Sequence, residues 1–376
     1  MKFGADSSSA VTALAVYRPG KEYRASDSTS VPLLFAAFAD CAIRCWDLAA
    51  SKARPVVLKG HRRTITCLAV HDPSAVLVSG SEDYSAIVWN ALTGEQLRCI
   101  AAAHQQPITA LAVDSVWRGG ELAEHSTWLF TGSADKTVAV TDSVGQLSAP
   151  EGHTGAITAI AVLQQAPDES AADVSAADAL LHVVTAGSGD YTAIVVWSKL
   201  NRPGSKVSFY IRCQIPVQNT VYALAMHVSA EASSDIEILA SVCRGVLAVW
   251  DLWEGRQIRS MEAEGAHSGE ILSLAMYAPS NGSSPAMVVT GGSDGITQVL
   301  NYKAGSLQHT LQSRNASCAI TCMAVFIPIK TKDNKVLLPE PALVTGSSDG
   351  QCTLWDLDTK QKLRSLLAPS SRRRGC

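Results

Sequence analysis

The sequence predicts an all-β fold built from repeated four-stranded units, and three observations support this prediction. A segment with a glycine, an acidic residue, a β-branched run and a tryptophan recurs along the chain, as in GSEDYSAIVW at residues 80–89. A short apolar run precedes each copy, as in TITCLAV at residues 64–70. No long stretch between the copies shows the apolar spacing that is typical of an amphipathic helix.

The acidic residue serves as the anchor on which the repeat is aligned. A tryptophan usually follows the anchor by six residues, and in the fourth unit Trp197 follows by seven. This alignment indicates seven units, because a period of this length is the mark of a repeat architecture. The seven anchor positions are Asp40, Asp83, Asp135, Asp190, Arg244, Asp294 and Asp349.

Each unit contains four short runs that favour strands over helices. The run before the anchor is almost continuously apolar and rich in β-branched residues, so we expect it to be a buried, innermost strand. A second run leads into the acidic turn, a third ends at the tryptophan position, and a fourth closes the unit, as in EQLRCI at residues 95–100. Aspartate followed by a small or polar residue suits the tight turn of a hairpin.

Seven such units predict a seven-bladed β-propeller of four-stranded antiparallel blades, since a ring leaves only short, protected sheet edges. Two further motifs recur. A histidine stands just ahead of the first strand in four units, and Trp-Asp ends the third strand in three: His61, His104, His153 and His267; Trp46-Asp47, Trp250-Asp251 and Trp355-Asp356. In these motifs the chain resembles the WD40-repeat family over residues 10–367. Residues 1–9 then form a short N-terminal segment and residues 368–376 a basic tail that we expect to be disordered.

The resemblance implies that a side-chain network of His, Ser or Thr, Asp and Trp holds each blade together. An aspartate in a nearly buried turn needs hydrogen-bond donors, and imidazole, hydroxyl and indole groups supply them. The residues expected in this structural network are His61, Ser79, Asp83 and Trp89; His104, Thr131 and Asp135; His153, Thr185, Asp190 and Trp197; His267, Thr290 and Asp294; and Thr345, Asp349 and Trp355.

Several units depart from the family pattern. Thr141 and Leu300 stand where tryptophan is expected, Ala36 replaces a hydroxyl residue, and the fifth unit has Arg244 as its anchor and no histidine. The chain also begins with an inner strand and ends with an outer one, whereas the family usually exchanges a terminal strand between its first and last blades. Either the ring closes without that exchange, or a strand upstream of Met1 is missing from the sequence.

Composition and charge indicate the kind of partner, the compartment and the state of the cysteines. The 376 residues carry a formal net charge of −3, and only 17% of them are charged, so the overall charge favours no nucleic-acid partner. No signal peptide or membrane-spanning run stands out, and we expect a soluble protein of the cytoplasm, with the nucleus as a second location. The ten cysteines include no C-x-x-C pair, which favours reduced structural thiols over disulfides or metal ligands.

The sequence gives little support for catalysis. It contains no H-E-x-x-H, G-x-S-x-G or P-loop motif and no cluster with metal-ligand spacing. We therefore expect a non-enzyme without cofactor, metal or small-molecule substrate. The arginines at residues 372–374 leave a nucleic-acid contact open. An RNA- or ribosome-associated propeller, a phosphoinositide-binding propeller and an enzyme remain as alternatives.

The preferred interpretation is a protein-interaction scaffold whose partners are other proteins of unknown identity. The resemblance implies that partners dock around the acidic turns, where Tyr and Arg are typical interface residues. The residues expected to bind them are Arg62, Arg63, Tyr84, Gln105, Gln106, Lys136, Tyr191 and Arg244. For Tyr84 and Tyr191, simple packing over the hairpin turn is an equal alternative. The long insertions between first and second strands, at residues 18–31, 114–127, 163–180, 227–235, 277–285 and 326–341, offer a second docking region on the opposite face.

Overall fold

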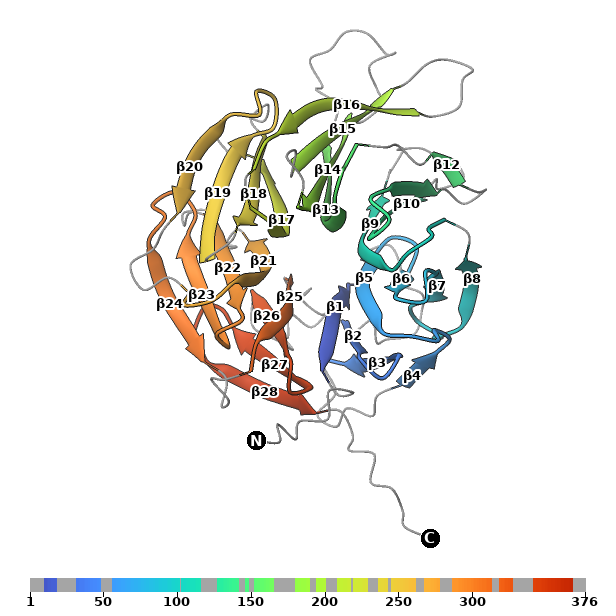
Figure 1. The fold of residues 1–376 in the computed structure, drawn as a ribbon. Coiled ribbons are helices and arrows are strands. Elements are labelled where there is room, and N and C mark those ends of the chain that lie inside the picture. The colour runs from blue at the N-terminus through green and yellow to red at the C-terminus, as the bar shows by residue number, and fades with distance from the viewer. Residues whose placement is uncertain are drawn as a thin grey trace, which may run out of the picture.

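A computed structural model of the chain describes residues 10–18, 32–48, 56–101, 103–115, 127–141, 146–148, 152–165, 180–189, 194–200, 208–217, 219–228, 236–242, 245–261, 267–277, 286–312, 318–326 and 341–367. Seven four-stranded antiparallel sheets are arranged as the blades of a β-propeller (Figure 1). The predicted fold class is therefore confirmed. None of the described ranges contains a helix that is long and apolar enough to cross a bilayer.

The first four blades follow the chain in order. Blade 1 comprises β1 (Val11–Tyr17), β2 (Leu33–Phe38), β3 (Ala42–Asp47) and β4 (Val56–Lys59). Blade 2 comprises β5 (Ile65–His71), β6 (Val76–Ser81), β7 (Ala86–Asn90) and β8 (Gln96–Ile100). Blade 3 comprises β9 (Ile108–Ser115), β10 (Thr127–Ser133), β11 (Val138–Thr141) and β12 (Gln146–Ser148). Blade 4 comprises β13 (Ala156–Gln165), β14 (Leu180–Ser188), β15 (Ile194–Leu200) and β16 (Ser208–Ile215).

The last three blades continue the same pattern. Blade 5 comprises β17 (Val221–Val228), β18 (Ile236–Val242), β19 (Val246–Asp251) and β20 (Gln257–Met261). Blade 6 comprises β21 (Ile271–Tyr277), β22 (Met287–Gly292), β23 (Ile296–Asn301) and β24 (Leu307–Gln312). Blade 7 comprises β25 (Ile320–Phe326), β26 (Ala342–Ser347), β27 (Gln351–Asp356) and β28 (Lys362–Leu367).

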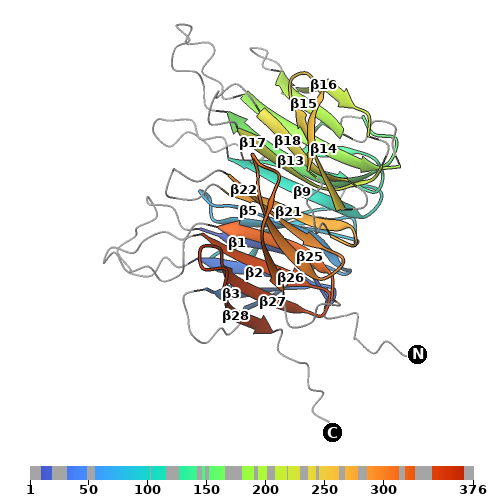
Figure 2. The same ribbon diagram turned by 90° about the vertical axis from the view of Figure 1, so that its left-hand side faces the viewer.

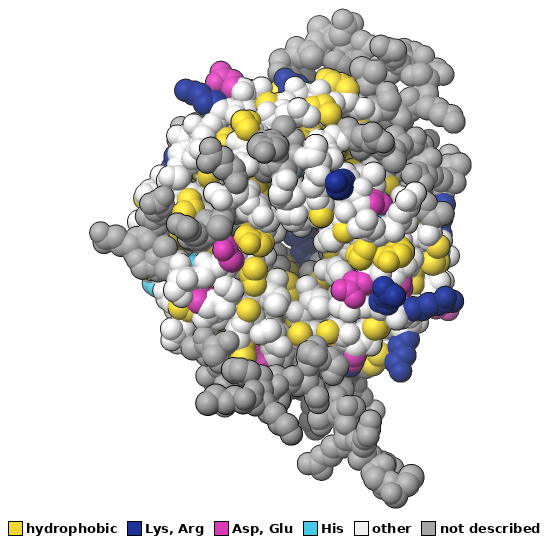
Figure 3. All heavy atoms as spheres, viewed as in Figure 1, with side chains coloured by type: hydrophobic (Ala, Val, Ile, Leu, Met, Phe, Trp, Pro, Cys, Tyr) yellow, Lys and Arg dark blue, Asp and Glu magenta, His cyan; other side chains and the backbone are white. Residues whose placement is uncertain are grey.

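The first strand of every blade lies innermost, as the apolar runs predict. These strands surround the centre of the ring in Figure 1, and Figure 3 shows a hollow there. Burial is less complete than the sequence suggests, since the five middle residues of β5 are only partly buried. An innermost strand packs its two faces on neighbouring blades, but the edge that is not paired with the second strand faces the central hollow.

A bulge near the start of each inner strand leaves one extra residue, which is a threonine in five of the blades, and four of these threonines bridge to the next blade. In β5 the pairing with β6 skips one residue between Ile65 and Cys67, so Thr66 is the extra residue. Its hydroxyl lies 2.5 Å from the carbonyl oxygen of Ile108 in blade 3 and 3.1 Å from that of Gly80 in its own blade. The same bridge to the next blade recurs as Thr109 to Ile157, Thr158 to Val221 and Thr321 to Val11.

Apolar side chains fill the space between neighbouring blades. Trp89 of blade 2, for example, packs in one buried cluster with Ile43 and Leu58 of blade 1. Similar clusters join other neighbouring blades, and the tryptophans at the ends of the third strands belong to them. Burial of this apolar surface between sheets is the main force that holds such a ring together.

The ring closes between blade 7 and blade 1 without a strand exchange. Each of the seven sheets consists of four consecutive strands, and β1 packs beside β25 and β26. Phe38 and Trp46 of blade 1 share a buried cluster with Phe326 and Leu354 of blade 7. In addition, Nη2 of Arg364 donates to the carbonyl of Leu48 at 2.9 Å. The described blades therefore form a closed ring in which no strand is exchanged.

Figure 2 shows the ring edge on, with β28 on the outside of blade 7. The N-terminal segment 1–9, the tail 368–376 and most of each long insertion lie outside the described residues. The domain boundaries and the docking role of the insertions therefore stay predictions.

Candidate functional site

The acidic turns and the histidine turns meet on one face of the ring. Backbone hydrogen bonds join them within each blade, as between the amide of Glu82 and the carbonyl of Thr64 at 2.9 Å, and between Ala134 and Pro107 at 2.9 Å. We call this the acidic-turn face and define it by the acidic turns 39–41, 82–85, 134–137, 293–295 and 348–350 with the histidine turns 61–64, 104–107 and 267–270.

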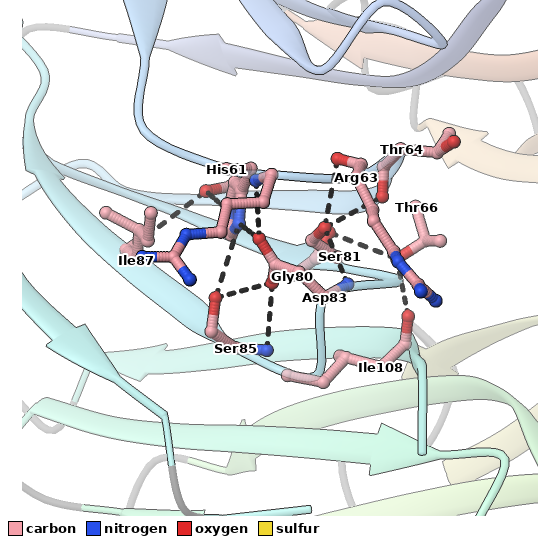
Figure 4. Close-up of polar contacts among 12 residues, drawn as sticks. His61, Arg63, Thr64, Thr66, Gly80, Ser81, Asp83, Ser85, Ile87 and Ile108 are labelled. Carbon is pink, nitrogen blue, oxygen red and sulfur yellow. Dashed lines mark hydrogen bonds and ion pairs between the residues drawn. The ribbon is translucent and has the colours of Figure 1, made fainter.

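Blade 2 contains a connected network of the four residue types that the resemblance implied. Nδ1 of His61 lies 2.9 Å from a carboxylate oxygen of Asp83, and its Nε2 lies 2.7 Å from Oγ of Ser79. The indole N–H of Trp89 donates to the same Ser79 hydroxyl at 2.9 Å. Figure 4 shows His61, Asp83 and Ser85 turned toward one another.

The chemistry of the two ends fixes the direction of the hydrogen bonds in this network. An indole nitrogen can only donate, and an ionised carboxylate can only accept. Ser79 therefore accepts from Trp89, and Nδ1–H of His61 donates to Asp83. Oγ of Ser79 lies 2.7 Å from Nε2 of His61 and 3.4 Å from the carbonyl oxygen of Ile87, which can accept its proton. The blade is thus held by a chain of hydrogen bonds that runs from the core to the turn.

Asp83 is the residue on which most of these bonds converge. The hydroxyl of Ser85 donates to it at 2.5 Å, and the backbone amide of Arg62 donates at 2.8 Å. Burial pushes the pKa of Asp83 upward, but the hydrogen bonds from Ser85, Arg62 and His61 outweigh it and lower the pKa to about 2. The carboxylate is thus committed to the turn and is ionised at neutral pH.

Parts of the same network recur in four other blades. In blade 3 His104 contacts both Asp135 and Thr131, and in blade 6 His267 contacts both Asp294 and Thr290. Blade 4 joins His153 and Trp197 through Thr185, and in blade 7 Trp355 donates to Thr345. Asp349 accepts from the hydroxyl of Ser347 and from the amide of Gln351. Asp190 lies outside the described residues.

Blades that lack a network residue fill its place differently. Thr141 and Leu300, at the tryptophan position, are both buried. In blade 5 Val217 occupies the place of the histidine and packs with Trp250 in an apolar cluster. In blade 1 Asp40 pairs with Arg44 instead, and the Arg44 guanidinium lies 4.3 Å from the centre of the Phe38 ring. The fold therefore tolerates apolar packing or an ion pair where the hydrogen-bonded network is absent.

The residues expected to bind partners are placed as follows. Six of them are exposed on the acidic-turn face of blades 2 and 3: Arg62, Arg63, Tyr84, Gln105, Gln106 and Lys136. Tyr84 exposes 38% of its surface, so it is accessible to a partner rather than covered by the turn. Tyr191 and Arg244 lie outside the described residues, and their part of the prediction stays untested.

Sequence reasoning missed a belt of arginines on the outer strands. Each reaches from the fourth strand of one blade to the turn after the third strand of the next. Arg212 stacks 3.9 Å from the ring centre of Trp253, and Arg259 lies 4.4 Å from that of Tyr302. Arg364 completes the set at the ring closure. These arginines end the similar triplets YIR, QIR and KLR at residues 210–212, 257–259 and 362–364, a repeat from which they could have been predicted.

Two histidines pack against the same aromatic rings. His182 meets the ring of Trp253 edge-on at 5.0 Å, and His227 meets that of Tyr302 at 4.8 Å. Burial, together with the positive charge of the nearby Arg212, lowers the pKa of His182 to about 4. His182 is therefore neutral at physiological pH and acts as part of the packing between blades 4 and 5.

The described ranges contain no group of three or more His, Cys, Asp or Glu residues placed to hold a metal ion. Eight cysteines fall within these ranges, and all of them are free thiols. Burial raises the pKa of Cys45 and Cys322 to about 12 and that of Cys67 to about 11. Such thiols are poor nucleophiles, because the thiolate is the reactive form.

Comparison with known proteins finds WD40 repeats in three parts of the chain. The model of the WD40 family, described as WD domain, G-beta repeat, matches residues 54–90, 95–142 and 305–356. These matches fall near the beginning and near the end of the chain, within a ring of seven four-stranded sheets. The chain contains WD40 repeats in a seven-bladed β-propeller. Proteins of this family are typically non-catalytic scaffolds for protein interactions.

Two further likenesses are weaker. The mouse WD repeat- and FYVE domain-containing protein 4 is 32% identical over 84 residues, which are 21% of this chain and 3% of that protein. The WD40 propeller thus matches only a small part of that relative's length. The crystal structure of the computationally designed Ika8 protein superposes with a TM-score of 0.58 at 22% identity, over 96% of this chain and 87% of the designed one. That likeness concerns the fold alone.

Proposed function

We propose that this WD40 propeller is a non-catalytic scaffold that binds other proteins through the acidic-turn face of blades 2 and 3. One observation carries the proposal. Exposed side chains, among them Arg62 and Lys136, stand on turns whose backbone the buried His61–Asp83 and His104–Asp135 pairs hold fixed. A rigid surface binds with a smaller loss of conformational entropy than a mobile one.

The setting of this function is also a proposal. The eight free cysteines of the described ranges support a reducing compartment, since exposed and half-buried thiols persist there without pairing. This is consistent with the cytoplasm, the location expected from the sequence.

Affinity purification with mass spectrometry tests the docking face. The intact protein is compared with a variant in which Arg62, Arg63, Tyr84 and Lys136 are all changed to alanine. We expect specific partners that co-purify with the intact protein and are lost with the variant. A matched control changes Arg256 to alanine, because Arg256 is exposed in the blade 5 turn between β19 and β20, at the opposite end of those strands from the acidic turns.

Circular dichroism of both variants confirms that the ring is folded before partners are compared. Partners that persist with the quadruple variant would place the docking surface elsewhere, and the proposal would then be wrong.

A further inference from the structure

One turn position shows an uneven use of residue types around the ring. The residue after the anchor has a positive φ in every hairpin that the structure describes there. Blades 5, 6 and 7 use glycine, which adopts this left-handed conformation readily: Gly245 at 74°, Gly295 at 77° and Gly350 at 81°. Blades 1, 2 and 3 place larger residues there: Cys41 at 65°, Tyr84 at 68° and Lys136 at 75°.

Side chains in this conformation are destabilising, so their presence calls for a reason. A left-handed backbone brings Cβ close to the following carbonyl oxygen, and strained positions of this kind cluster at functional sites. Tyr84 and Lys136 are both exposed, so no contact with the core explains them. Their amides donate to Ser81 and Ser133 at 3.2 Å, and each side chain therefore projects from a fixed turn.

The same sector is the basic part of the acidic-turn face. Arg62 and Arg63 are exposed beside Tyr84, and Lys136 stands on the neighbouring blade. None of these three cations forms an ion pair with a residue in the described ranges. Figure 3 shows lysine and arginine side chains gathered over the blade of β5 to β8.

The acidic groups of this sector are less exposed than these cations. Asp83 and Asp135 keep their negative charge, but their side chains are only 12% exposed and are hydrogen-bonded to the imidazoles of His61 and His104. Glu82, the third acid of the two turns, is half-buried, whereas Arg62, Arg63 and Lys136 are exposed. Blade 6 differs, since its two turns present Ser268, Glu270, Ser293 and Asp294 and no cation. Positive charge on the described part of this face is thus concentrated on blades 2 and 3.

We propose that Arg62, Arg63, Tyr84 and Lys136 form a docking site for an extended, acidic peptide segment of a partner protein. The arginine guanidiniums match carboxylates in a two-pronged geometry, and Lys136 supplies a third charge about one blade away. Tyr84 offers a flat apolar surface with a polar tip, and Gln105 and Gln106, exposed on the histidine turn of blade 3, can bond a peptide backbone through their side-chain amides. This inference rests on the proposed function and names the chemistry of its partner.

Selection from a random 12-residue peptide library displayed on phage tests the site. The full chain is the target, beside a variant with Arg62→Glu, Arg63→Glu and Lys136→Glu and a control with Arg256→Glu. We expect aspartate and glutamate to be enriched about twofold or more in the selected peptides. The best peptide, labelled with fluorescein, should lose affinity by about tenfold or more with the triple variant, keep it with the control, and bind less tightly as salt is raised.

The outcomes separate this inference from the proposed function. Selected peptides without acidic enrichment that still require Tyr84 would keep the docking face and overturn its acidic specificity. Acidic peptides that bind the triple variant equally well would overturn the site. A fluorescein-labelled 12-nucleotide RNA of mixed sequence that binds more tightly than every peptide would assign the cations to phosphate instead. Failure to select any peptide, together with co-purified partners that persist in the quadruple alanine variant, would overturn both proposals.

Discussion

The hydroxyl of Thr321 lies 2.6 Å from the carbonyl oxygen of Val11, although 310 residues separate them in the chain. This bond joins the first strand of blade 7 to the first strand of blade 1. It repeats the bond that Thr66, Thr109 and Thr158 make to the blade that follows each of them. The ring closure is thus built with the same contact as the internal boundaries, and a strand exchange is absent from the described blades.

Replacement of this threonine should weaken the closure. Thr321→Val keeps the volume and removes the donor, so Val11 loses a hydrogen-bond partner, and we expect a loss of about 1–2 kcal/mol in the free energy of unfolding. Urea denaturation followed by tryptophan fluorescence measures it. Thr109→Val is the matched variant inside the ring and should lose a similar amount. An unchanged midpoint for Thr321→Val alone would show that the closure depends on the apolar cluster and Arg364.

The blade 2 network should behave as one unit. Trp89→Phe removes the indole donor and part of a buried ring, and we expect it to lower the free energy of unfolding by about 2 kcal/mol. In a double-mutant cycle with Ser79→Ala, the coupling should be about 0.5–1.5 kcal/mol, because both changes break the same bond. Thr345→Val in blade 7 is the distant partner for comparison, and its effect should simply add to that of Trp89→Phe.

The left-handed turns should trade stability for binding. Tyr84→Gly and Lys136→Gly relieve the backbone at a positive φ, and we expect each to raise the free energy of unfolding by about 0.5–1 kcal/mol. Thermal melting measures the gain. Gly295→Ala makes the opposite change at the equivalent position of blade 6 and should lower stability by about 1 kcal/mol or more. Lower melting temperatures for both glycine variants would contradict the strain on which the docking site was inferred.

Mild acid should weaken the contact between blades 4 and 5. The pKa of His182 is lowered to about 4 in the folded state, chiefly by burial, whereas an unfolded histidine titrates near 6.5. Its contribution to stability is therefore complete above pH 6.5 and is lost as the pH falls toward 4, by at most about 1 kcal/mol per pH unit. His182→Phe should flatten the dependence of the melting temperature on pH in that window. His309→Gln, at an exposed histidine, should leave the slope as it is.

Stronger acid should act through Asp83. Its pKa of about 2 lies below the ordinary value of 3.8. The carboxylate therefore contributes stability above pH 4, and this contribution is lost as the pH falls from about 4 to about 2. We expect Asp83→Asn to be less stable at neutral pH and to show a smaller further loss between pH 4 and pH 2, by thermal melting. Asp358→Asn, at an exposed aspartate, serves as the control. Equal slopes for Asp83→Asn and the intact protein would contradict the assignment.

The number and order of the blades could be predicted because their signals are local. An apolar run, an acidic turn and a tryptophan lie within one unit, and antiparallel strands joined by short turns pair with their neighbours in sequence. The partners of Asp83 followed from the resemblance to the WD40-repeat family, which implies a histidine ahead of the first strand, a hydroxyl residue before the anchor and a tryptophan after it. The arginines of the outer strands were missed, although their triplets recur, because their partners lie in the next blade.

The sequence by itself determined seven four-stranded blades and the residue types that stabilise their turns, since both depend on spacing within one unit. Only the tertiary structure decided how the ring closes, which carbonyl each bulge threonine reaches, and that Tyr84 and Lys136 stand exposed on left-handed turns. Those features depend on where the backbone of one blade lies relative to another, and on backbone angles that Tyr and Lys rarely adopt. The spacing of residues along the chain determines neither the relative position of two blades nor these backbone angles.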